Sequence, residues 1–551
     1  MGTRRRVLCV FPRYAKSFAT FNHAFPLVGA KALMPPQGIL VVASYLPRHW
    51  DVRFIDENVS PLTDEDVLWA DAVFLSGMHV QRDEIRRLAD LANKHGTLTV
   101  LGGASVSGCP DWYPDIDILH IGELGNGSDA LIARLEGDIS RPARQEVYKT
   151  TDRLPMSEFP APLYTAIRLR DYFLASVQFS SGCPFQCEFC DIPELYGRKP
   201  RLKSPKQVTM ELDAMLARGN PGSVYFVDDN FIGNPRATME LLDELVRWQE
   251  EKGFPVRLAC EATLNIAGMP EILKRMRLAY FTTVFCGIES PEEDALRAMK
   301  KSQNLRNPIL DAVRTINSYG LEVASGIIIG LDTDTPDTYG RIADFIEASQ
   351  IPLLTINLLE ALPRTPLWRR LERDGRLIAE SPDRGSNVDF LLPYSTVDAG
   401  WRECISRAYL PAAVYDRYRH QIEETYPHRR HVPPTKARVN FGMIRLGLAT
   451  FCRAAWRVGF RSDYRREFWR TAALSLRRGG LDRGLESLIE VALVSHHLIE
   501  FTREALAGHG EKAFYASTTP SLPEDIDHAG GSPTPVVLQP TPKRLSARTP
   551  S

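Results

Sequence analysis

The stretch Phe179-Ser-Ser-Gly-Cys183-Pro-Phe-Gln-Cys187-Glu-Phe-Cys190 decides how the rest of this 551-residue sequence is interpreted. It places three cysteines at the spacing C-x3-C-x2-C, directly after an apolar, strand-like segment. Three thiolates this close together can hold three irons of a cubane cluster and leave the fourth iron open, whereas ordinary clusters use four cysteines. A structural zinc site would need a fourth Cys or His, and no histidine occurs from residue 121 to residue 419. The triplet therefore predicts an open [4Fe-4S] site.

Strand-like and helical segments alternate six times from residue 173 onward. The strand-like segments are 173–180, 224–228, 256–259, 283–287, 323–330 and 353–358. Six consecutive βα units are typical of a full or partial barrel of parallel strands. We assign residues 173–360 to this barrel.

Residues 1–140 show the same alternation on a smaller scale, with strand-like segments at 7–10, 52–55, 72–76, 98–102 and 118–121. This pattern predicts an α/β fold with a doubly wound parallel sheet. Ligands of such sheets bind at the carboxyl ends of the strands. The candidate binding residues at those ends are Asp56, Ser76, Gly77, His79, Gly102, Gly103, Gly122 and Glu123.

The remaining segments show no strand alternation. Residues 141–172 are rich in proline and charge and are interpreted as a linker. Residues 361–430 form an extension of the barrel, and residues 431–515 are predicted to be helical. Residues 516–551 contain many Pro, Ser and Thr and few large apolar groups, a composition typical of a disordered tail.

Composition narrows the class of protein further. Lys plus Arg number 67 and Asp plus Glu number 68, giving a formal net charge of −1, which excludes a chain-wide nucleic-acid binder. No uncharged apolar run reaches the ~20 residues of a membrane span, and no apolar segment follows the N-terminal arginines as in a secretory leader. Nine cysteines, six of them scattered, indicate a reducing compartment. We expect a cytoplasmic protein.

The cysteine triplet, with Phe189 before its last cysteine, resembles the radical S-adenosylmethionine (SAM) superfamily. The resemblance implies that SAM chelates the open iron and that a flavodoxin- or ferredoxin-type donor reduces the cluster. The residues that it implies as SAM contacts are Phe189, Asp228, Asp229, Asn230, Glu289, Gly326 and Gly330, with Glu261 as a further candidate. Each also has a structural explanation, because paired aspartates often cap helices and strand glycines often serve packing.

A doubly wound domain ahead of such a barrel resembles the cobalamin-binding branch of the superfamily. That branch implies cobalamin, as methylcobalamin, at the eight strand-end residues of the N-terminal domain, although tight βα turns alone would also explain their glycines. The D-x-H-x-x-G sequence that supplies a histidine to cobalt elsewhere is absent. We therefore expect cobalamin without an axial histidine, and His79 as either a lower-face contact or a surface-loop residue.

Longer blocks, including Cys190-Asp-Ile-Pro-Glu-Leu-Tyr-Gly-Arg and Gly222-Ser-Val-Tyr-Phe-Val-Asp-Asp-Asn-Phe, are similar to those of hopanoid-methylating members of this branch. This resemblance implies methyl transfer to an unactivated carbon of a polycyclic lipid, at C-2 of a hopanoid, with no catalytic residues beyond the cofactors. Two alternatives stay open. One is a related reaction on a tetrapyrrole, either methylation or ring closure. The other is a non-catalytic iron–sulfur or cobalamin sensor or carrier.

Residues 436–483 form a strongly basic segment within the neutral chain, with twelve Lys or Arg, three acidic residues and interleaved aromatics. A basic helix with Trp and Phe suits the surface of an anionic bilayer. On this interpretation the segment brings the barrel mouth to the inner face of the membrane as a peripheral contact. The alternative is a helical subdomain whose apolar stripe packs on the barrel while its arginines remain solvated.

Overall fold

The computed structural model describes residues 3–378, 385–432 and 441–508. Its N-terminal region contains a six-stranded parallel sheet in the order β2-β1-β3-β4-β5-β6. The strands are β1 (Arg6–Phe11), β2 (Asp51–Asp56), β3 (Ala72–Ser76), β4 (Leu98–Gly102), β5 (Ile118–Ile121) and β6 (Glu146–Lys149). The strand order reverses at β1, which lies between β2 and β3. This confirms the predicted doubly wound sheet and places its ligand crevice at the carboxyl ends of β1 and β3.

Helices cover both faces of this sheet, because alternate residues of each buried strand point to opposite sides. On β1, Leu8 and Val10 belong to one core and Val7 and Cys9 to the other. The covering helices are α2 (Gln37–Tyr45), α3 (Asp64–Trp69), α4 (Arg82–Lys94), α5 (Ala104–Gly108) and α6 (Asn126–Gly137).

The segment predicted as a linker instead contributes β6 to this sheet, and β6 pairs in parallel with β5. The prediction of a linker over 141–172 was wrong here because β6 is a four-residue edge strand whose Glu146 and Lys149 carry charge, as edge strands commonly do. The residues after β6 are packed as well, since Met156, Tyr164 and Tyr172 are buried.

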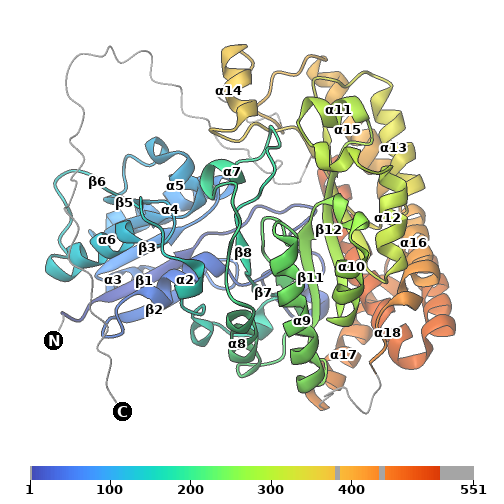
Figure 1. The fold of residues 1–551 in the computed structure, drawn as a ribbon, viewed down its shortest axis with the longest axis horizontal. Coiled ribbons are helices and arrows are strands. Elements are labelled where there is room, and N and C mark those ends of the chain that lie inside the picture. Colours follow the sequence, from blue (N-terminus) through green and yellow to red (C-terminus); the bar gives the residue numbers. More distant parts are fainter. Residues whose placement is uncertain (1–2, 379–384, 433–440, 509–551) are drawn as a thin grey trace.

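The second sheet is also parallel, in the order β14-β13-β12-β11-β10-β7, so neighbours in space follow one another along the chain. The strands are β7 (Ala175–Val177), β10 (Ser223–Phe226), β11 (Arg257–Ala262), β12 (Phe281–Glu289), β13 (Glu322–Ile329) and β14 (Leu353–Leu358). The helices between them are α8 (Pro205–Leu216), α9 (Pro235–Lys252), α10 (Pro270–Leu278), α12 (Ile309–Ser318) and α13 (Thr338–Ser349). They lie on the outer side of the sheet (Figure 1). This is the predicted partial barrel of six βα units.

Strand β11 shows how the sequence assigns side chains to the two sides of the barrel. Leu258, Cys260 and Ala262 are buried, whereas the intervening Ala259 and Glu261 are accessible. Because successive side chains point to opposite faces of a strand, Glu261 faces the interior of the barrel at the carboxyl end of β11.

Helices make up the rest of the described chain, as the sequence predicts. They are α14 (Pro366–Arg373), α15 (Tyr394–Ala408), α16 (Pro411–His420), α17 (Phe441–Ala454) and α18 (Arg465–Leu506), the last kinked at Gly480. The predicted tail over 516–551 lies outside the described residues. None of the helices within the described ranges is long and apolar enough to cross a membrane.

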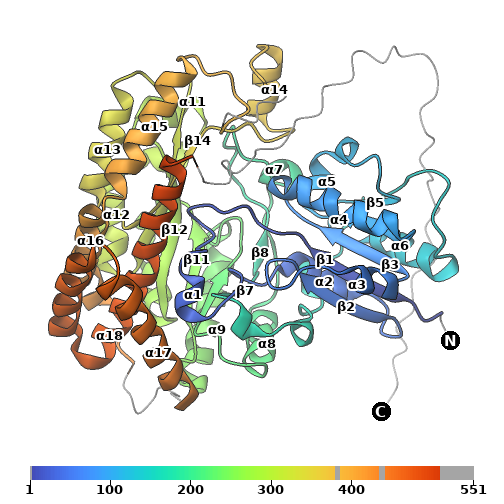
Figure 2. The same ribbon diagram turned by 180° about the vertical axis from the view of Figure 1, so that it is seen from behind.

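A seam between the edge strands β7 and β14 is closed by segments from both ends of the chain. The ring of Phe18 stacks on Tyr409 with centroids 5.0 Å apart and meets Phe501 of α18 at 4.6 Å. The imidazole Nε2 of His497 lies 3.1 Å from the backbone oxygens of Ser17 and Phe18. Figure 2 shows α18 running along this side of the barrel beside the N-terminal segment. The C-terminal helices therefore complete the wall of the barrel.

Candidate active site

The cysteine triplet lies on a loop whose base is held closed. Strand β8 (Ser180–Ser181) pairs antiparallel with β9 (Arg201–Leu202). Inside the loop, the Cys183 N–H donates to the Gly197 oxygen at 3.2 Å. Gly182 adopts φ 97°, and a Cβ at this position would lie 2.8 Å from the same Gly197 oxygen. Glycine is therefore required where the chain turns into the first cysteine.

The three thiols of the loop lie near one another, and none forms a disulfide. Burial raises the pKa of the Cys190 thiol, and the neighbouring Cys187 and Cys183 raise it further. Thiolates of a cubane bind different irons and need not converge on one point. In the described ranges, no three His, Cys, Asp or Glu side chains are grouped to hold a single metal ion. The arrangement fits the predicted cluster site.

The loop rests on the segment that follows β12. The backbone N–H of Glu188 donates to the Met299 oxygen at 3.0 Å. The ring of Phe189 packs against the small hydrophobic core that contains Met299. The side-chain amide Nε2 of Gln303 lies 3.3 Å from the Sγ of Cys187, and both residues are buried. Phe189 therefore anchors the loop, and Gln303 gives Cys187, a predicted cluster ligand, an N–H···S hydrogen bond.

A buried ion pair lies next to this contact between the triplet loop and the segment after β12. Lys301 Nζ lies 2.5 Å from Glu289 Oε1 at the end of β12, and 5.5 Å from the centroid of the Phe189 ring. Burial lowers the pKa of Lys301, but Glu289, Cys187 and Cys190 outweigh burial and raise it overall. A Cβ on Gly287 would lie 2.3 Å from Glu289 Oε1, so glycine makes room for the pair. Glu289, predicted as a SAM contact, is thus engaged by Lys301.

The aspartates at the end of β10 also hold the triplet loop. Asp228 Oδ2 accepts from the Phe179 N–H at 3.1 Å, and its Oδ1 accepts from both the N–H and the hydroxyl of Ser180. Asp229 Oδ2 accepts from the Gly182 N–H at 2.6 Å. Neither aspartate caps α9, whose N-cap is Asn234. Their first role is to fix the chain that enters the triplet.

These carboxyl groups form an acidic rim with raised pKa values. Burial raises the pKa of Asp228 to about 7 against the hydrogen bonds that lower it. Burial raises the pKa of Asp229 to about 6. Glu261 is accessible within the barrel, yet desolvation by the protein around it, with contributions from both aspartates, raises its pKa to about 7. Crowded carboxylates destabilise one another unless a cation joins them. The rim therefore suits a positively charged ligand such as SAM.

Three other predicted SAM residues lie on the same side of the barrel. The Asn230 amide Nδ2 lies 3.4 Å from Thr263 Oγ1, and its side chain also hydrogen-bonds the Cys183 thiol. Gly326 lies beside Glu289 and Thr355. Gly330 has φ 93°, and a Cβ there would lie 2.5 Å from the Phe390 ring, so packing of the extension explains this glycine.

The carboxyl edge of the N-terminal sheet faces the triplet loop. Glu123, after β5, forms ion pairs with Arg201 and with Arg153, the latter at 3.1 Å. The same carboxylate accepts from the Ser181 hydroxyl at 3.2 Å. Because Ser181 and Arg201 form the base of the triplet loop, Glu123 ties the predicted cobalamin edge directly to the cluster site.

His79 lies at the same interface and is buried, so the expectation of a surface-loop histidine was wrong. Its Nε2 is 3.8 Å from a carboxylate oxygen of Asp191, which follows Cys190 directly. The ring fits because position 108 is glycine, where a Cβ would lie 2.6 Å from it. Burial lowers the pKa of His79 to about 4, with Arg82 adding to the effect. The imidazole is therefore neutral near pH 7.

The other strand-end residues divide into structural and open positions. Asp56 accepts from the Tyr172 hydroxyl at 3.1 Å and so links the sheet to the segment before the barrel. Gly103 packs against Ser76, whose Oγ would be 2.6 Å from a Cβ there, and it also borders Gly77. A Cβ on Gly102 would lie 3.9 Å from His120, and Gly122 has φ 98°. Tight turns thus explain Gly103 and Gly122, whereas a side chain at Gly102 would make only an ordinary contact with His120.

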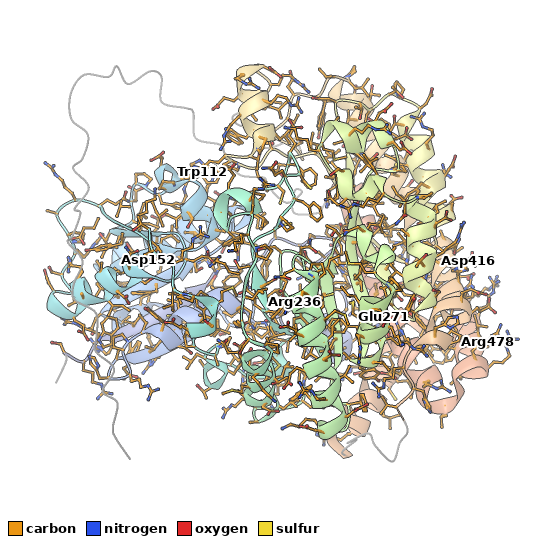
Figure 3. The ribbon with its side chains drawn as sticks, viewed as in Figure 1. Trp112, Asp152, Arg236, Glu271, Asp416 and Arg478 are labelled. Carbon is orange, nitrogen blue, oxygen red and sulfur yellow. The ribbon has the colours of Figure 1, made fainter. Side chains whose placement is uncertain are left out.

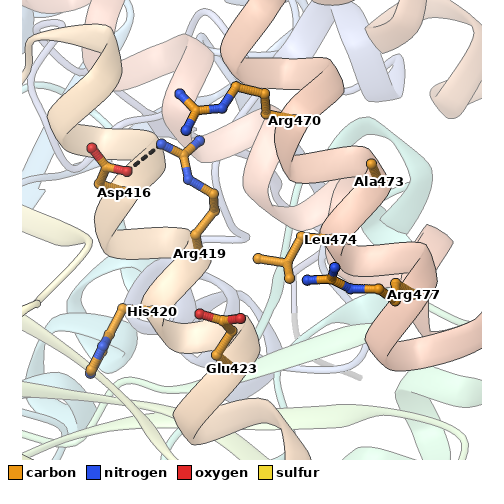
Figure 4. A pocket seen from close by; sticks show the side chains of 8 residues that line it. All are labelled: Asp416, Arg419, His420, Glu423, Arg470, Ala473, Leu474 and Arg477. Carbon is orange, nitrogen blue, oxygen red and sulfur yellow. Dashed lines mark hydrogen bonds and ion pairs between the residues drawn. The ribbon is translucent and has the colours of Figure 1, made fainter.

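Two hollows lie apart from the triplet. A cleft of about 410 Å³ at the carboxyl ends of β1 and β2 includes Glu57, Asn58 and Phe25 among its walls. A more open hollow of about 540 Å³ lies between α16 and α18 (Figure 4). Within it, Arg419 forms an ion pair with Asp416, whereas Glu423 and Arg470 pair with residues outside the hollow. Its walls are Asp416, Arg419, His420, Glu423, Arg470, Ala473, Leu474 and Arg477.

Sequence reasoning missed Lys301, Gln303 and Glu360. Lys301 and Gln303 follow a helix rather than a strand end, and the only signal was a second charge twelve residues after Glu289. Glu360 follows β14, and burial raises its pKa well above the ordinary value. In the sequence, Glu360 directly follows a predicted strand of the barrel, but no motif there indicated a site residue.

Comparisons with known proteins agree with this architecture. A radical SAM superfamily model matches residues 177–346, a B12 binding domain model matches 27–132, and a domain of unknown function matches 365–511. The solved structure of the cobalamin-dependent SAM radical enzyme OxsB superposes with a TM-score of 0.54 at 16% identity, covering 92% of this chain and 80% of that one. Fold and site together define a cobalamin-binding radical SAM protein.

Similarity to two proteins narrows this class further. The hopanoid C-2 methylase of Rhodopseudomonas palustris is 55% identical over 515 residues, which span 93% of this chain and 97% of the relative. The hopanoid C-3 methylase of Methylococcus capsulatus is 26% identical, over 64% of this chain and 72% of that protein. The chain belongs to the hopanoid C-2 methylase family.

Proposed function

We propose that this chain is a cobalamin-dependent radical SAM methyltransferase that methylates an unactivated carbon of a polycyclic lipid, C-2 of a hopanoid. The observation that carries the proposal is that the carboxyl edge of the N-terminal sheet faces the triplet loop. Glu123 accepts a hydrogen bond from the base of that loop. His79 lies beside Asp191, which follows Cys190 directly. A ligand at each edge would therefore adjoin the same space.

An sp3 C–H bond is not acidic, so a general base cannot prepare its carbon for alkylation. When bound, the cofactors supply what side chains cannot, namely a 5′-deoxyadenosyl radical from SAM and a methyl group carried by cobalamin. The absence of histidine from residue 121 to residue 419 fits a barrel in which no imidazole acts as acid or base. The protein's own residues position the reactants and exclude water.

Particular residues divide these tasks. Cys183, Cys187 and Cys190 would hold the cluster, with Gln303 bonded to one of them. The acidic rim of Asp229 and Glu261 would attract the cationic SAM. Asp228 is already engaged by three donors, so we assign it to holding the loop rather than to direct ligand binding.

The proposal includes the partners of the reaction. The substrate is a polycyclic lipid, and a flavodoxin- or ferredoxin-type protein donates the electron. We place the protein in the cytoplasm, in peripheral contact with the inner face of the membrane that holds the lipid. The support for this location is the lipid named for the 55% identical relative, together with the basic C-terminal segment.

The test uses anaerobically reconstituted full-length protein with reductant, methyl-labelled SAM and a pentacyclic hopanoid such as diploptene. Label is expected at C-2 of the A ring. Each turnover should use two SAM molecules and yield one 5′-deoxyadenosine and one S-adenosylhomocysteine. Label entering a tetrapyrrole and never a hopanoid would contradict the substrate assignment. SAM cleavage without any methylated product would contradict the methyl transfer, and no SAM cleavage at all would favour a sensor or carrier.

A further inference from the structure

An exposed aromatic surface lies at the corner between α17 and α18. Trp456 and Phe460, in the π-helical segment η10 (Ala455–Phe460), are 63% and 59% exposed, and Trp469 of α18 is 41% exposed. Their rings form one group, with centroids 6.4 Å apart for the first pair and 5.6 Å apart for Phe460 and Trp469. We call these three residues the aromatic corner.

The aromatic corner is held in shape by the backbone beneath it. The indole Nε1 of Trp469 donates to the Gly459 oxygen at 2.8 Å. A Cβ on Gly459 would lie 2.8 Å from the Phe468 ring and 3.1 Å from Trp469, so glycine allows the rings to close on the turn. The large apolar side chains are thus presented to solvent in a fixed arrangement, which soluble surfaces rarely do without a partner.

Positive charge surrounds the aromatic corner. Arg457, Arg461, Arg465 and Arg466 are all exposed. Across the described ranges, none of these four forms an ion pair. The two acids nearest in sequence are engaged elsewhere: Asp463 pairs with Arg503 at 2.7 Å, and Glu467 pairs with Arg419 at 2.9 Å and with Arg470 at 3.2 Å. The local charge is therefore uncompensated by the protein.

We propose that the aromatic corner and its four arginines dock on an anionic phospholipid bilayer. Tryptophan and phenylalanine suit the interface between head groups and acyl chains, and unpaired arginines complement anionic head groups. The docking surface is inferred from its own geometry. It rests on the proposed function only for the identity of the lipid substrate that docking brings within reach. Membrane docking is then the function of the basic segment, which lies in the region matched by the domain of unknown function.

The position of this surface corrects one expectation from the sequence. In both views α17 lies at the end of the barrel opposite to α11 (Glu293–Ala298), which directly follows the carboxyl end of β12 (Figures 1 and 2). Helix α17, which ends just before the aromatic corner, therefore does not lie at the barrel mouth. Helix α17 instead packs on α1 (Phe25–Val28), and Phe25 borders the cleft at the carboxyl ends of β1 and β2. Docking holds the protein at the bilayer beside this cleft.

The test measures co-flotation of full-length protein with substrate-free vesicles of phosphatidylcholine, with or without phosphatidylglycerol. One variant reverses the charge of the four arginines to Glu, and another carries Trp456→Ser with Phe460→Ser. The control carries Arg218→Glu, Arg236→Glu, Arg277→Glu and Arg314→Glu, which change the charge equally on exposed positions around the barrel helices. Figure 3 marks Arg236 on α9.

We expect wild type and control to bind anionic vesicles and to dissociate at high salt. The arginine variant should bind at least about tenfold more weakly, and the serine variant should also lose binding, while both keep uncoupled SAM cleavage. Binding unchanged in either variant, equal loss in the control, or insensitivity to salt would overturn the proposal. If vesicle binding behaves as expected but no hopanoid is methylated, the proposed function fails and this surface stands.

Discussion

Replacing Asp228 with Asn should loosen the entry to the cysteine loop. The carboxylate of Asp228 has only donors as neighbours: the Phe179 N–H at one oxygen, and the N–H and hydroxyl of Ser180 at the other. Whichever way the amide is oriented, its NH2 group must face a donor. The less costly orientation leaves the buried Phe179 N–H without an acceptor, at about 1–3 kcal/mol.

Hydrogen exchange followed by mass spectrometry measures this effect locally, which suits a multidomain chain. A loss of about 1–3 kcal/mol corresponds to exchange roughly 5- to 150-fold faster at the Phe179 and Ser180 amides if opening is local. The matched control is Asp213→Asn, on α8, which should leave these amides unchanged. Unchanged exchange in Asp228→Asn would refute the clamp, as would equal acceleration in the control.

The pH dependence of Asp228 has a definite sign. Burial raises its pKa from 3.8 to about 7, so between these values the folded protein holds a proton that the unfolded chain has lost. The free energy of unfolding should therefore fall as pH rises from about 4 to about 7 and level off above. Asp229 and Glu261 shift in the same direction. Asp228→Asn should reduce this slope in thermal melts recorded from pH 5 to pH 8.

Three further outcomes are expected. Cys187→Ala should abolish 5′-deoxyadenosine formation by reconstituted protein. The control Cys452→Ala alters an exposed cysteine outside the triplet and should form the product at the wild-type rate. Formation at the wild-type rate by Cys187→Ala would contradict the cluster site. With Co(II) cobalamin bound, the electron paramagnetic resonance spectrum should lack nitrogen superhyperfine splitting, and a splitting that disappears in His79→Ala would contradict the histidine-free site. Gln303→Leu should lower the midpoint potential of the cluster by ~40 mV. Loss of the N–H···S bond removes about 1 kcal/mol of stabilisation from the reduced form, which corresponds to that shift for one electron. An unchanged potential would show that this bond does not tune the cluster.

Much of the fold could be predicted from sequence because buried parallel strands are short apolar runs between turn residues. The bounds predicted for β3 (Ala72–Ser76) and β14 (Leu353–Leu358) match the structure. Strand β6 escaped prediction because Glu146 and Lys149 conceal an exposed edge strand. Alternation along the chain shows which segments are strands, but it does not reveal a polar strand at the edge of a sheet.

The site was predictable where chemistry is encoded in spacing, as in the cysteine triplet, and less so where it depends on contacts between distant elements. The burial of His79 depends on Gly108 and Asp191, which come from two other elements. Gln303 reaches Cys187 across 116 positions of sequence. No local pattern contains such pairs, because tertiary packing alone brings them together.

The seam closed by Phe18 and His497 has a consequence for how the protein is made. The bond from His497 to the Ser17 carbonyl joins residues 480 positions apart, so the barrel wall cannot be finished until the ribosome has synthesised almost the whole described chain. Contacts this distant slow folding, because the intervening chain must be ordered before they are gained. A fragment that ends after β14 would leave Phe18 without Tyr409 and Phe501. Separate expression of the two cofactor-binding regions would therefore yield an open, aggregation-prone barrel rather than a working half.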